Sequence, residues 1–425
     1  MRITLITSGS RGDVEPYVAF AEGLRDSGHE VTIATEARYE PFILERRLNF
    51  FSIPGDTIAA INSPKGHEAL NKRNNTRSFF NHLTNASAPM ATEIILQCLA
   101  ACKNADHIIC THFSLHTGFF LSQQLGIPFS MASVNPMIGC ETNEFHNMMF
   151  PQGASWLPRF SDRAYNAFSH KTVSDLWWKS YRHIYIGAWK SACNVTLPTT
   201  DPLKTAKPPL SLFGYSPVIL KKPIDWGNNR HVCGYWFLKA DDNWQPPAEL
   251  EKFIETGPQP IYIGFGSMNN SMLKNGAVEK LILHTIAATK QRAVFLKQGL
   301  NFEAGQIADN IFATGAVPFK YLFPKMKLLV HHGGAGTTAL GLEAGTPSVL
   351  TPLIVDQRFW AYRVKKMGVA PAPLHWYGVT AAKLASAINH WIDNPSAKNR
   401  AEELGKKLAS ENGVQTAVRI FNEAI

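Results

Sequence analysis

The stretch from Leu329 to Thr338 reads LVHHGGAGTT and indicates the architecture of the second half of the chain. A short apolar run ends at His331, a turn of small residues follows, and a helix can begin near Ala335. Small residues let the backbone approach an anion, and the first N–H groups of the helix would point at it. The stretch therefore predicts a diphosphate cradle, although a tight turn with a buried histidine remains the structural alternative.

Similar strand, turn and helix patterns recur on both sides of this stretch. Short runs rich in β-branched residues predict strands at 3–7, 31–35, 50–53, 107–111 and 129–134, and again at 261–265, 293–297, 311–313, 328–331 and 348–351. Helical spacing between such runs is typical of a parallel sheet. We therefore predict an α/β protein of two Rossmann-like, doubly wound domains.

A proline-rich connection divides the two predicted domains. The segment 197–247 holds eight prolines and no sustained periodicity. We expect an N-terminal domain at 1–215, a linker region at 216–247, a C-terminal domain at 248–405 and a final helical segment at 406–425 that packs near the domain interface.

The composition excludes a disordered chain, a fibrous protein and a small disulfide-stabilised protein, but it does not indicate a function. The 425 residues are 45% hydrophobic and carry 42 Lys plus Arg against 33 Asp plus Glu, a net charge of +9. Six scattered cysteines fit reduced thiols better than a disulfide framework, which favours a cytoplasmic location. No window approaches the roughly 20 apolar residues of a transmembrane helix. Lys and Arg occur as short pairs, which is typical of solvent-exposed surface, so we expect no nucleic-acid partner.

A second motif follows the first predicted strand. Thr7 to Pro16 reads TSGSRGDVEP, and its spacing matches neither the Gly-x-Gly-x-x-Gly dinucleotide fingerprint nor a phosphate-binding loop with Gly-Lys-Ser/Thr. Asp13 has two interpretations there. It can cap a helix, or it can act as a general base at a cleft, kept ionised by the neighbouring Arg11.

The two motifs, together with Asp356-Gln357 after a later strand, resemble those of the nucleotide-sugar glycosyltransferases of the GT-B fold, UDP-glycosyltransferase family 1. The similarity is strongest to sterol and lipid glucosyltransferases and to the transferases that decorate glycopeptide and polyketide antibiotics. It covers most of the chain. It implies two Rossmann-like domains that face each other across a cleft.

The resemblance also implies roles for particular residues. Asp13 matches the family's general base, and Asp356 and Gln357 match the pair that hydrogen-bonds the sugar hydroxyls. The remaining donor-binding positions are Ser10, Arg11 and Ser267 near the diphosphate, His332, Gly334, Gly336 and Thr337 in the cradle, and Val317 beside the nucleobase. The implied reaction is inverting transfer of a hexose, glucose as the first choice, to a hydroxyl of a hydrophobic acceptor, without a metal or a cofactor.

This sequence departs from the pattern of many plant-type relatives where the nucleoside binds. Ala316 replaces the base-stacking tryptophan, Phe319 replaces a glutamine, and the ribose-binding glutamate falls near Leu340. UDP-sugar is expected before dTDP-sugar as the donor.

The sequence indicates the acceptor site less clearly than the donor site. The segment 137–189 is dense in Met and aromatic residues, which fit an apolar acceptor pocket or a helix core about equally. The acceptor candidates are Met137, Phe145, Met149, Trp177 and Trp178. The same segment leaves transient contact with a membrane surface open, and we expect a monomer or a weak dimer.

Two rival functions fit the same fold. A nucleotide-sugar epimerase would also cradle a diphosphate but would need no acceptor. A non-catalytic auxiliary protein would keep the fold and activate a partner transferase.

Overall fold

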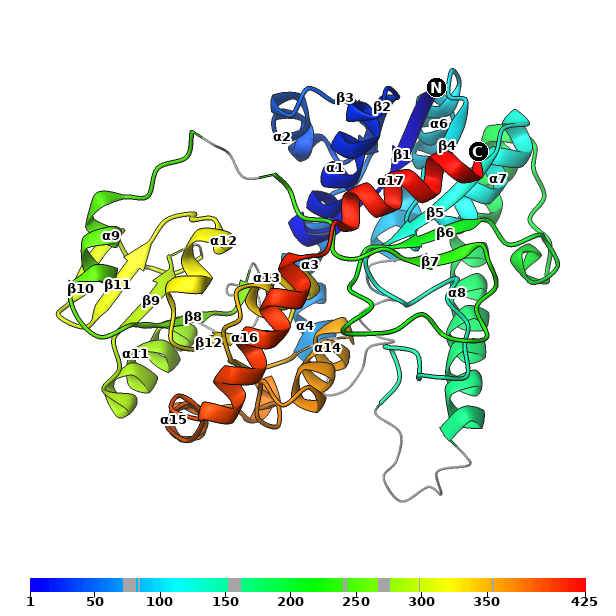
Figure 1. Cartoon of the computed structure of the whole chain (residues 1–425). Coiled ribbons are helices and arrows are strands. Elements are labelled where there is room, and N and C mark those ends of the chain that lie inside the picture. The colour runs from blue at the N-terminus through cyan, green and yellow to red at the C-terminus, as the bar shows by residue number, and fades with distance from the viewer. Residues whose placement is uncertain are drawn as a thin grey trace. The chain divides into compact units, whose positions relative to one another are not determined.

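The computed structural model describes residues 1–71, 82, 85–151, 162–239, 243–266, 276–297, 299–353 and 355–425. The chain divides into two compact units. Unit 1 comprises Met1–Ala69, Asn75–Lys239 and Asn412–Ile425, and unit 2 comprises Leu70–Asn74 and Ala240–Glu411. Each unit contains its own sheet (Figure 1).

Unit 1 contains a seven-stranded sheet in the order β3-β2-β1-β4-β5-β6-β7, with every described strand pair parallel. Its strands are β1 (Arg2–Ile6), β2 (Glu30–Thr35), β3 (Asn49–Ser52), β4 (His107–Cys110), β5 (Phe129–Ser133), β6 (Leu210–Phe213) and β7 (Arg230–Val232). Its principal helices are α1 (Arg11–Asp26), α2 (Glu40–Glu45), α3 (Thr57–Asn62), α4 (Pro64–Asn71), α6 (Ala91–Cys102), α7 (Leu115–Leu125), α8 (Asp162–Cys193) and α17 (Gly413–Ala424).

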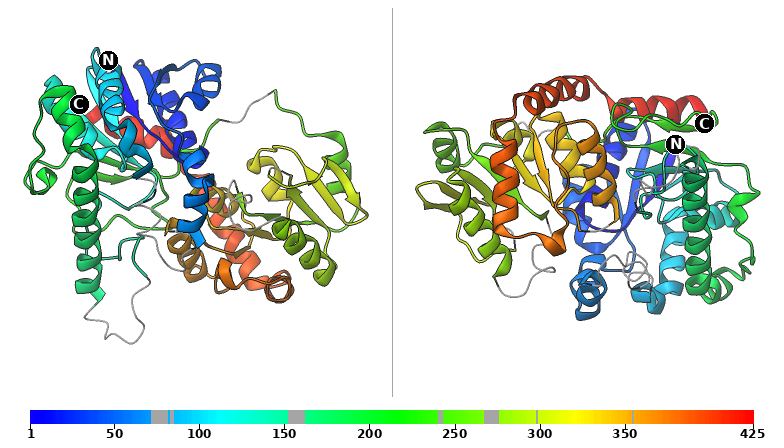
Figure 2. Two further views of the ribbon diagram at one scale, coloured as in Figure 1. Left: turned by 180° about the vertical axis from the view of Figure 1, so that it is seen from behind. Right: turned by 90° about the horizontal axis from the view of Figure 1, so that it is seen from below.

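Helices cover both faces of this sheet. Helices α1 and α17 share one core with the strand residues Leu5, Ile109 and Leu212, whereas α6, α7 and α8 pack on the opposite face. Figure 2 shows the long α8 running along that second face. The C-terminal helix α17 is therefore part of unit 1 although the chain reaches it from unit 2.

Unit 2 contains a six-stranded sheet in the order β10-β11-β9-β8-β12-β13, in which only the β10–β11 pair is antiparallel among the described pairs. Its strands are β8 (Ile261–Gly264), β9 (Ala293–Leu296), β10 (Gly305–Ala308), β11 (Ile311–Thr314), β12 (Leu329–His331) and β13 (Ser348–Leu350). Its principal helices are α9 (Ala248–Glu255), α11 (Ala277–Thr289), α12 (Phe319–Leu322), α13 (Ala335–Glu343), α14 (Val355–Lys366), α15 (Ala381–Trp391) and α16 (Pro395–Ala409).

The structure confirms the predicted α/β class and the parallel sheets, and it adds three strands. Each of the ten predicted strands overlaps an observed one, but β6, β7 and β10 were not predicted. Strands β6 and β7 lie inside the proline-rich segment that we interpreted as a connection. They are only four and three residues long, too short to show an apolar alternation, and β7 at the sheet edge is only half-buried.

The boundary between the units reflects those added strands. The chain passes from unit 1 to unit 2 at residue 240, inside the predicted 216–247 region, but residues 216–239 belong to unit 1 because β7 joins its sheet. The chain returns to unit 1 at Asn412, within the predicted final segment 406–425.

The contact between α1 and α17 makes a testable prediction about stability. A Cβ atom on Gly23 would lie 2.5 Å from Val414 Cγ1, so Gly23→Leu should push α17 away from α1 and lower the free energy of unfolding by about 1–3 kcal/mol. Denaturant unfolding measures this. The control is Gly187→Ala in α8, where a Cβ meets nothing within 4 Å and helix propensity predicts no loss of stability. Equal midpoints for wild type and Gly23→Leu would contradict the packing argument.

Candidate functional site

In unit 1 the candidate site lies where the strand order reverses. Chain connections from β1 lead outward to β2, while β4 lies on the other side of β1, so the carboxyl ends of β1 and β4 flank the topological switch point. Ligands of open parallel sheets bind at such points. The loop after β1 leads directly into α1 and carries Asp13 in the first turn of that helix.

Hydrogen bonds tie Asp13 to the start of α1. Its Oδ2 accepts from Ser10 N at 2.9 Å, as the third helical residue does in a capping box, and also from Ser10 Oγ at 2.8 Å. Gly9 has a φ of +132°, and a Cβ there would lie 2.7 Å from Asp13 Oδ2. The capping interpretation is confirmed. Within the described part of the chain Asp13 Oδ1 accepts no hydrogen bond, so one oxygen is left for a ligand.

The electrostatics around Asp13 differ from the prediction. Burial raises the pKa of Asp13, although the two hydrogen bonds from Ser10 work against that rise. The expectation that Arg11 keeps this carboxyl ionised is wrong. The exposed Arg11 side chain pairs with Glu15 at 2.6 Å, an i,i+4 spacing that a helix brings together, and its guanidinium lies over the Phe42 ring.

Arg38 supplies the positive charge near Asp13, and sequence reasoning missed it. It donates to Gly9 O and pairs with the buried Glu36 at 2.7 Å. Glu36 in turn accepts from Gly9 N at 3.2 Å, and Tyr39 Oη donates to Gly9 O at 2.9 Å. Glu36 directly follows β2 at the same edge of the sheet, and that position was the available signal.

His112 is a second residue at this edge that the sequence analysis did not single out. It follows β4, is 2% exposed, and its Nδ1 lies within hydrogen-bond distance of Ser133 Oγ at 2.9 Å. Its Nε2 is buried without a hydrogen-bond partner among the described residues. Burial lowers its pKa to about 3, so the ring is neutral at pH 7.

In unit 2 the glycine-rich stretch also lies at a switch point. The strand order reverses between β8 and β12, and the two turns that follow these strands touch. Gly266 has a φ of +73°, and a Cβ there would lie 2.7 Å from the His332 ring. The two glycine-containing strand ends therefore lie side by side within this unit.

His332 is held in this turn with an unused nitrogen. Its Nδ1 is buried and has no hydrogen-bond partner among the described residues. Burial lowers the pKa of His332 to about 4, so the ring is neutral at pH 7. A Cβ on Gly334 would lie 2.5 Å from His332 Nε2, which explains the glycine at that position.

Helix α13 begins directly after this turn. Gly334 is its N-cap and provides no side-chain cap, so the first N–H groups of α13 have no carbonyl of a preceding turn to bind. A Cβ on Gly336 would meet no atom within 4 Å, which leaves open space over the helix start. Thr337 lies in the first turn and is partly buried. These are the features of an anion cradle.

The next strand brings Asp356 and Gln357 beside the cradle. A Cβ on Gly333 would lie 3.1 Å from Gln357 O, so the first turn of α14 adjoins the glycine-rich turn. Gln357 is 4% exposed and its Oε1 accepts from Leu353 N at 2.9 Å. Asp356 precedes it and is partly buried. The Val317 side chain packs into the core, so only its backbone could meet a ligand.

The remaining predicted residues are scattered. Ser267 lies outside the described residues. Trp178 is 3% exposed in the core of α6, α7 and α8 and donates to Thr199 O at 3.0 Å, which supports the helix-core alternative for that residue. Met137 and Phe145 are buried, and Met149 and Trp177 are partly buried.

Metal ions and membranes are two further kinds of partner to consider. No group of three His, Cys, Asp or Glu side chains in the described ranges is arranged to hold a metal ion. Across the same residues, no helix combines the length and the apolar character needed to cross a bilayer. The cytoplasmic location and contact with a membrane surface stay predictions.

Two family models match the chain, one in each half. The model of the glycosyltransferase family 28 N-terminal domain matches residues 3–138, and that of the erythromycin biosynthesis protein CIII-like C-terminal domain matches residues 281–423. The chain is 33% and 32% identical to two sterol 3-beta-glucosyltransferases of Arabidopsis thaliana, over 99% of its length and 65% and 68% of theirs. It spans 33% of the sterol 3-beta-glucosyltransferase of Pichia angusta.

A bacterial relative matches end to end, and solved structures share the fold. The chain is 29% identical to the O-mycaminosyltylonolide 6-deoxyallosyltransferase of Streptomyces fradiae, over 100% of its own length and 97% of that protein. The kitacinnamycin glycosyltransferase structure gives a TM-score of 0.69 at 18% identity, covering 99% and 98% of the two chains. A Streptomyces glycosyltransferase in complex with thymidine diphosphate gives 0.62 at 19% identity, covering both chains fully. These structures confirm the GT-B fold.

Proposed function

This chain belongs to the glycosyltransferases, and we propose that it transfers a hexose, glucose as the first choice, from a nucleoside diphosphate sugar to a hydroxyl of a hydrophobic acceptor. The acceptor would be a sterol, another lipid or a polyketide-type aglycone; the names of two relatives point to a sterol and to O-mycaminosyltylonolide as their acceptors. The observation that carries the proposal is the contact of Gly266 with His332 at the switch point of unit 2, next to an uncapped helix start.

Asp13 is the proposed general base. Its Oδ1 would take the proton of the acceptor hydroxyl while the acceptor oxygen attacks the anomeric carbon. The new C–O bond forms on the face opposite the leaving diphosphate, whose bond to that carbon breaks, so the sugar configuration inverts. Ser10 holds the other carboxylate oxygen, which leaves the basic oxygen oriented rather than free to rotate.

The donor would bind unit 2, with its diphosphate over the start of α13. The leaving diphosphate gains negative charge as the bond breaks, and fixed N–H donors lower the energy of that state without reorganising. His332 is neutral, so it would contribute a single N–H rather than a charge. Asp356 and Gln357 would bind the sugar hydroxyls, and the backbone near Val317 would meet the base.

A thermal-shift comparison tests the donor. We expect UDP-glucose to stabilise the protein more than dTDP-glucose, whereas the thymidine diphosphate complex of a structural neighbour favours the opposite order. The shift is a direct consequence of binding to the folded state alone. No shift with either compound would count against the proposed donor site. Formation of an epimeric sugar nucleotide from donor alone would favour the epimerase instead.

The pKa of Asp13 predicts a pH dependence for the reaction. A general base must be deprotonated, and burial raises the pKa of this carboxyl above the ordinary value of 3.8. The specificity constant kcat/KM should therefore rise with pH as Asp13 loses its proton, with a midpoint above pH 3.8. Asp13→Asn should abolish this rise. A pH profile of the wild type and this variant measures it. An identical rise in the variant would assign the ionisation to another group.

A further inference from the structure

The peptide group between Gly9 and Ser10 connects Asp13 to Arg38. Its N–H donates to Asp13 Oδ2 at 2.9 Å. Its carbonyl oxygen accepts from the Arg38 guanidinium and, at 2.9 Å, from Tyr39 Oη. A cation at the carbonyl draws electron density away from the N–H, which makes that N–H a stronger donor. Arg38 therefore acts on the Asp13 carboxyl through this peptide group as well as through space.

Glu36 holds the other polar group of Gly9. Its carboxylate is buried and accepts from Gly9 N at 3.2 Å, from Thr57 N at 3.3 Å and from Thr57 Oγ1 at 2.6 Å, besides pairing with Arg38 at 2.7 Å. Such a set of donors is what a buried carboxylate requires. Thr57 is the first residue of α3, so Glu36 ties together the loop after β1, the loop after β2 and the start of α3.

The position of Gly9 decides the position of the Asp13 carboxyl. A Cβ on Gly9 would lie 2.7 Å from both Cβ and Oδ2 of Asp13, so the Gly9 backbone packs directly against that side chain. Glu36 binds the N–H of Gly9 and Arg38 binds its carbonyl, which leaves this residue little freedom to move. Loss of either contact would therefore be felt at Asp13.

The same two residues place opposite charges near Asp13. Burial raises the pKa of Asp13 and the hydrogen bonds from Ser10 lower it; beyond these, the charge of Glu36 raises the pKa and the charge of Arg38 lowers it. The other titratable groups around the start of α1 are Tyr17, Tyr39 and His112, which are neutral at pH 7, and Arg11 and Glu15, which pair with each other.

We propose that Glu36 and Arg38 are positioning residues for Asp13, which fix the loop after β1 through both polar groups of Gly9 and set the field in which the carboxyl takes up its proton. The inference rests on the proposed function, because Asp13 is the proposed base of that reaction. Both residues act through Asp13 rather than on the substrate. Their opposite charges act in opposite directions on the ionisation of Asp13, whereas two residues that only stabilised the loop would not.

Carbon-13 NMR of the aspartate carboxyl groups in the whole chain measures this ionisation without requiring turnover. The signal of Asp13 is identified by its loss in Asp13→Asn. The variants Arg38→Gln and Glu36→Gln each remove one charge and keep a side chain that can form hydrogen bonds. The pH dependence of kcat/KM with UDP-glucose and cholesterol is measured in parallel, because kcat/KM reports the ionisations of the free enzyme.

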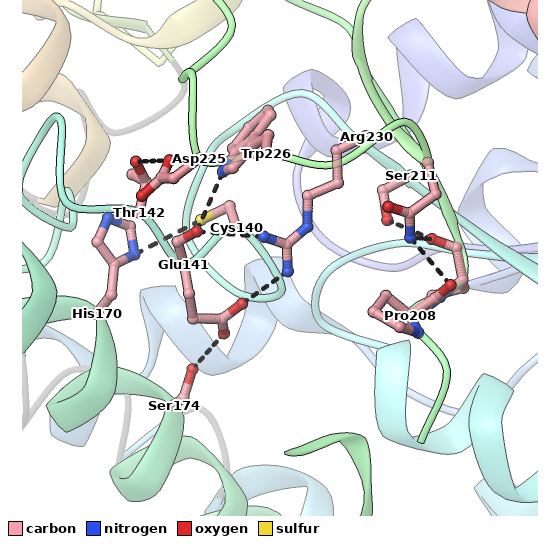
Figure 3. Close-up of polar contacts among 12 residues, drawn as sticks. Cys140, Glu141, Thr142, His170, Ser174, Pro208, Ser211, Asp225, Trp226 and Arg230 are labelled. Carbon is pink, nitrogen blue, oxygen red and sulfur yellow. Dashed lines mark hydrogen bonds and ion pairs between the residues drawn. The ribbon is translucent and has the colours of Figure 1, made fainter. Parts of the chain in front are cut away.

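The matched control is Arg230→Gln, which also breaks an arginine–glutamate pair of unit 1. Figure 3 shows the Arg230 guanidinium beside the Glu141 carboxylate, at 3.0 Å. Arg230 begins β7, which lies at the edge of the sheet, four strands from β1. It lines a cavity of about 730 Å³ to which α8 and strands β5, β6 and β7 contribute. The control therefore removes a charge without changing the surroundings of Asp13.

We expect the midpoint of the Asp13 titration to move to higher pH in Arg38→Gln and to lower pH in Glu36→Gln, and to stay in place in Arg230→Gln. On the rising part of the pH profile, kcat/KM relative to each variant's own plateau should be about threefold lower in Arg38→Gln and about threefold higher in Glu36→Gln. The changes are small because the Arg38 side chain is 29% exposed and water screens its charge. Combining both substitutions should bring the midpoint back toward that of wild type.

A shift in the same direction in both single variants, or no shift in either, would overturn the proposal. So would an equal shift in Arg230→Gln. If the NMR midpoints move as expected but the kcat/KM profile does not follow them, or no transfer to any acceptor is observed, the proposed role of Asp13 as base fails while the positioning by Glu36 and Arg38 stands.

Discussion

Asp13→Asn is expected to lower kcat by about 10²–10⁴-fold, the usual contribution of a positioned general base. Asparagine keeps a carbonyl oxygen that can accept from Ser10 N, so the start of α1 should remain capped. It cannot take the proton of an acceptor hydroxyl. Donor binding to unit 2 should be unchanged because Asp13 belongs to unit 1. Steady-state kinetics with a saturating donor, together with donor titration, measure both effects.

A matched aspartate separates the chemistry from the capping. Asp56 caps α3 by accepting from Ala59 N at 2.8 Å, in the same unit as Asp13, and asparagine keeps the oxygen that also accepts from Arg38 at 3.4 Å. Asp56→Asn should therefore leave kcat nearly unchanged. A similar loss of activity in the two variants would mean that unit 1 tolerates no change at its helix starts, and full activity of Asp13→Asn would remove Asp13 as the base.

His332→Ala is expected to lower kcat by about 10²–10³-fold, in the range found when one preorganised donor to a developing anion is removed. The ring nitrogen has no other partner among the described residues, so the substitution breaks no internal hydrogen bond there. The effect should fall mainly on kcat, since the diphosphate gains charge only as the sugar leaves. Donor affinity measured by calorimetry should decline less than the rate does.

The control for this substitution is a histidine of the same unit outside the cradle. His390 is exposed in the last turn of α15, so His390→Ala should leave kcat unchanged. An unchanged kcat in His332→Ala would show that the helix start alone serves the leaving group. A loss confined to KM would reassign His332 to donor binding in the ground state.

The two turns that carry the proposed catalytic residues could be predicted from the sequence because their signals are local. Gly334 and Gly336 lie within five residues of a strand end. A strand followed by such a turn and a helix is typical of a parallel sheet. The same argument placed Asp13 at the start of α1. In the structure the ends of β8 and β12 meet, because these neighbouring parallel strands end at one edge of the sheet.

The contacts that could not be predicted from the sequence are those that residue spacing does not indicate. Arg11 stands two residues from Asp13, yet the turn of the helix carries it to Glu15. Arg38 approaches Gly9 from 29 positions away. The aromatic density around Trp178 fitted a pocket or a helix core about equally, and this ring packs in the core of three helices. A cavity lies where β6 and β7, two strands too short for any periodicity, complete the sheet.

Local sequence patterns were sufficient to predict the α/β class, the positions of the strands that flank the sites, and the two turns on which the proposed chemistry depends. Hydrophobic periodicity and glycine spacing act over a few residues, and that range suffices for these features. Only tertiary contacts decide which charge faces Asp13, why His332 Nδ1 is buried without a partner among the described residues, and where unit 1 has a cavity. Those outcomes depend on segments that the chain brings together across tens of residues, and packing rather than local preference selects among them.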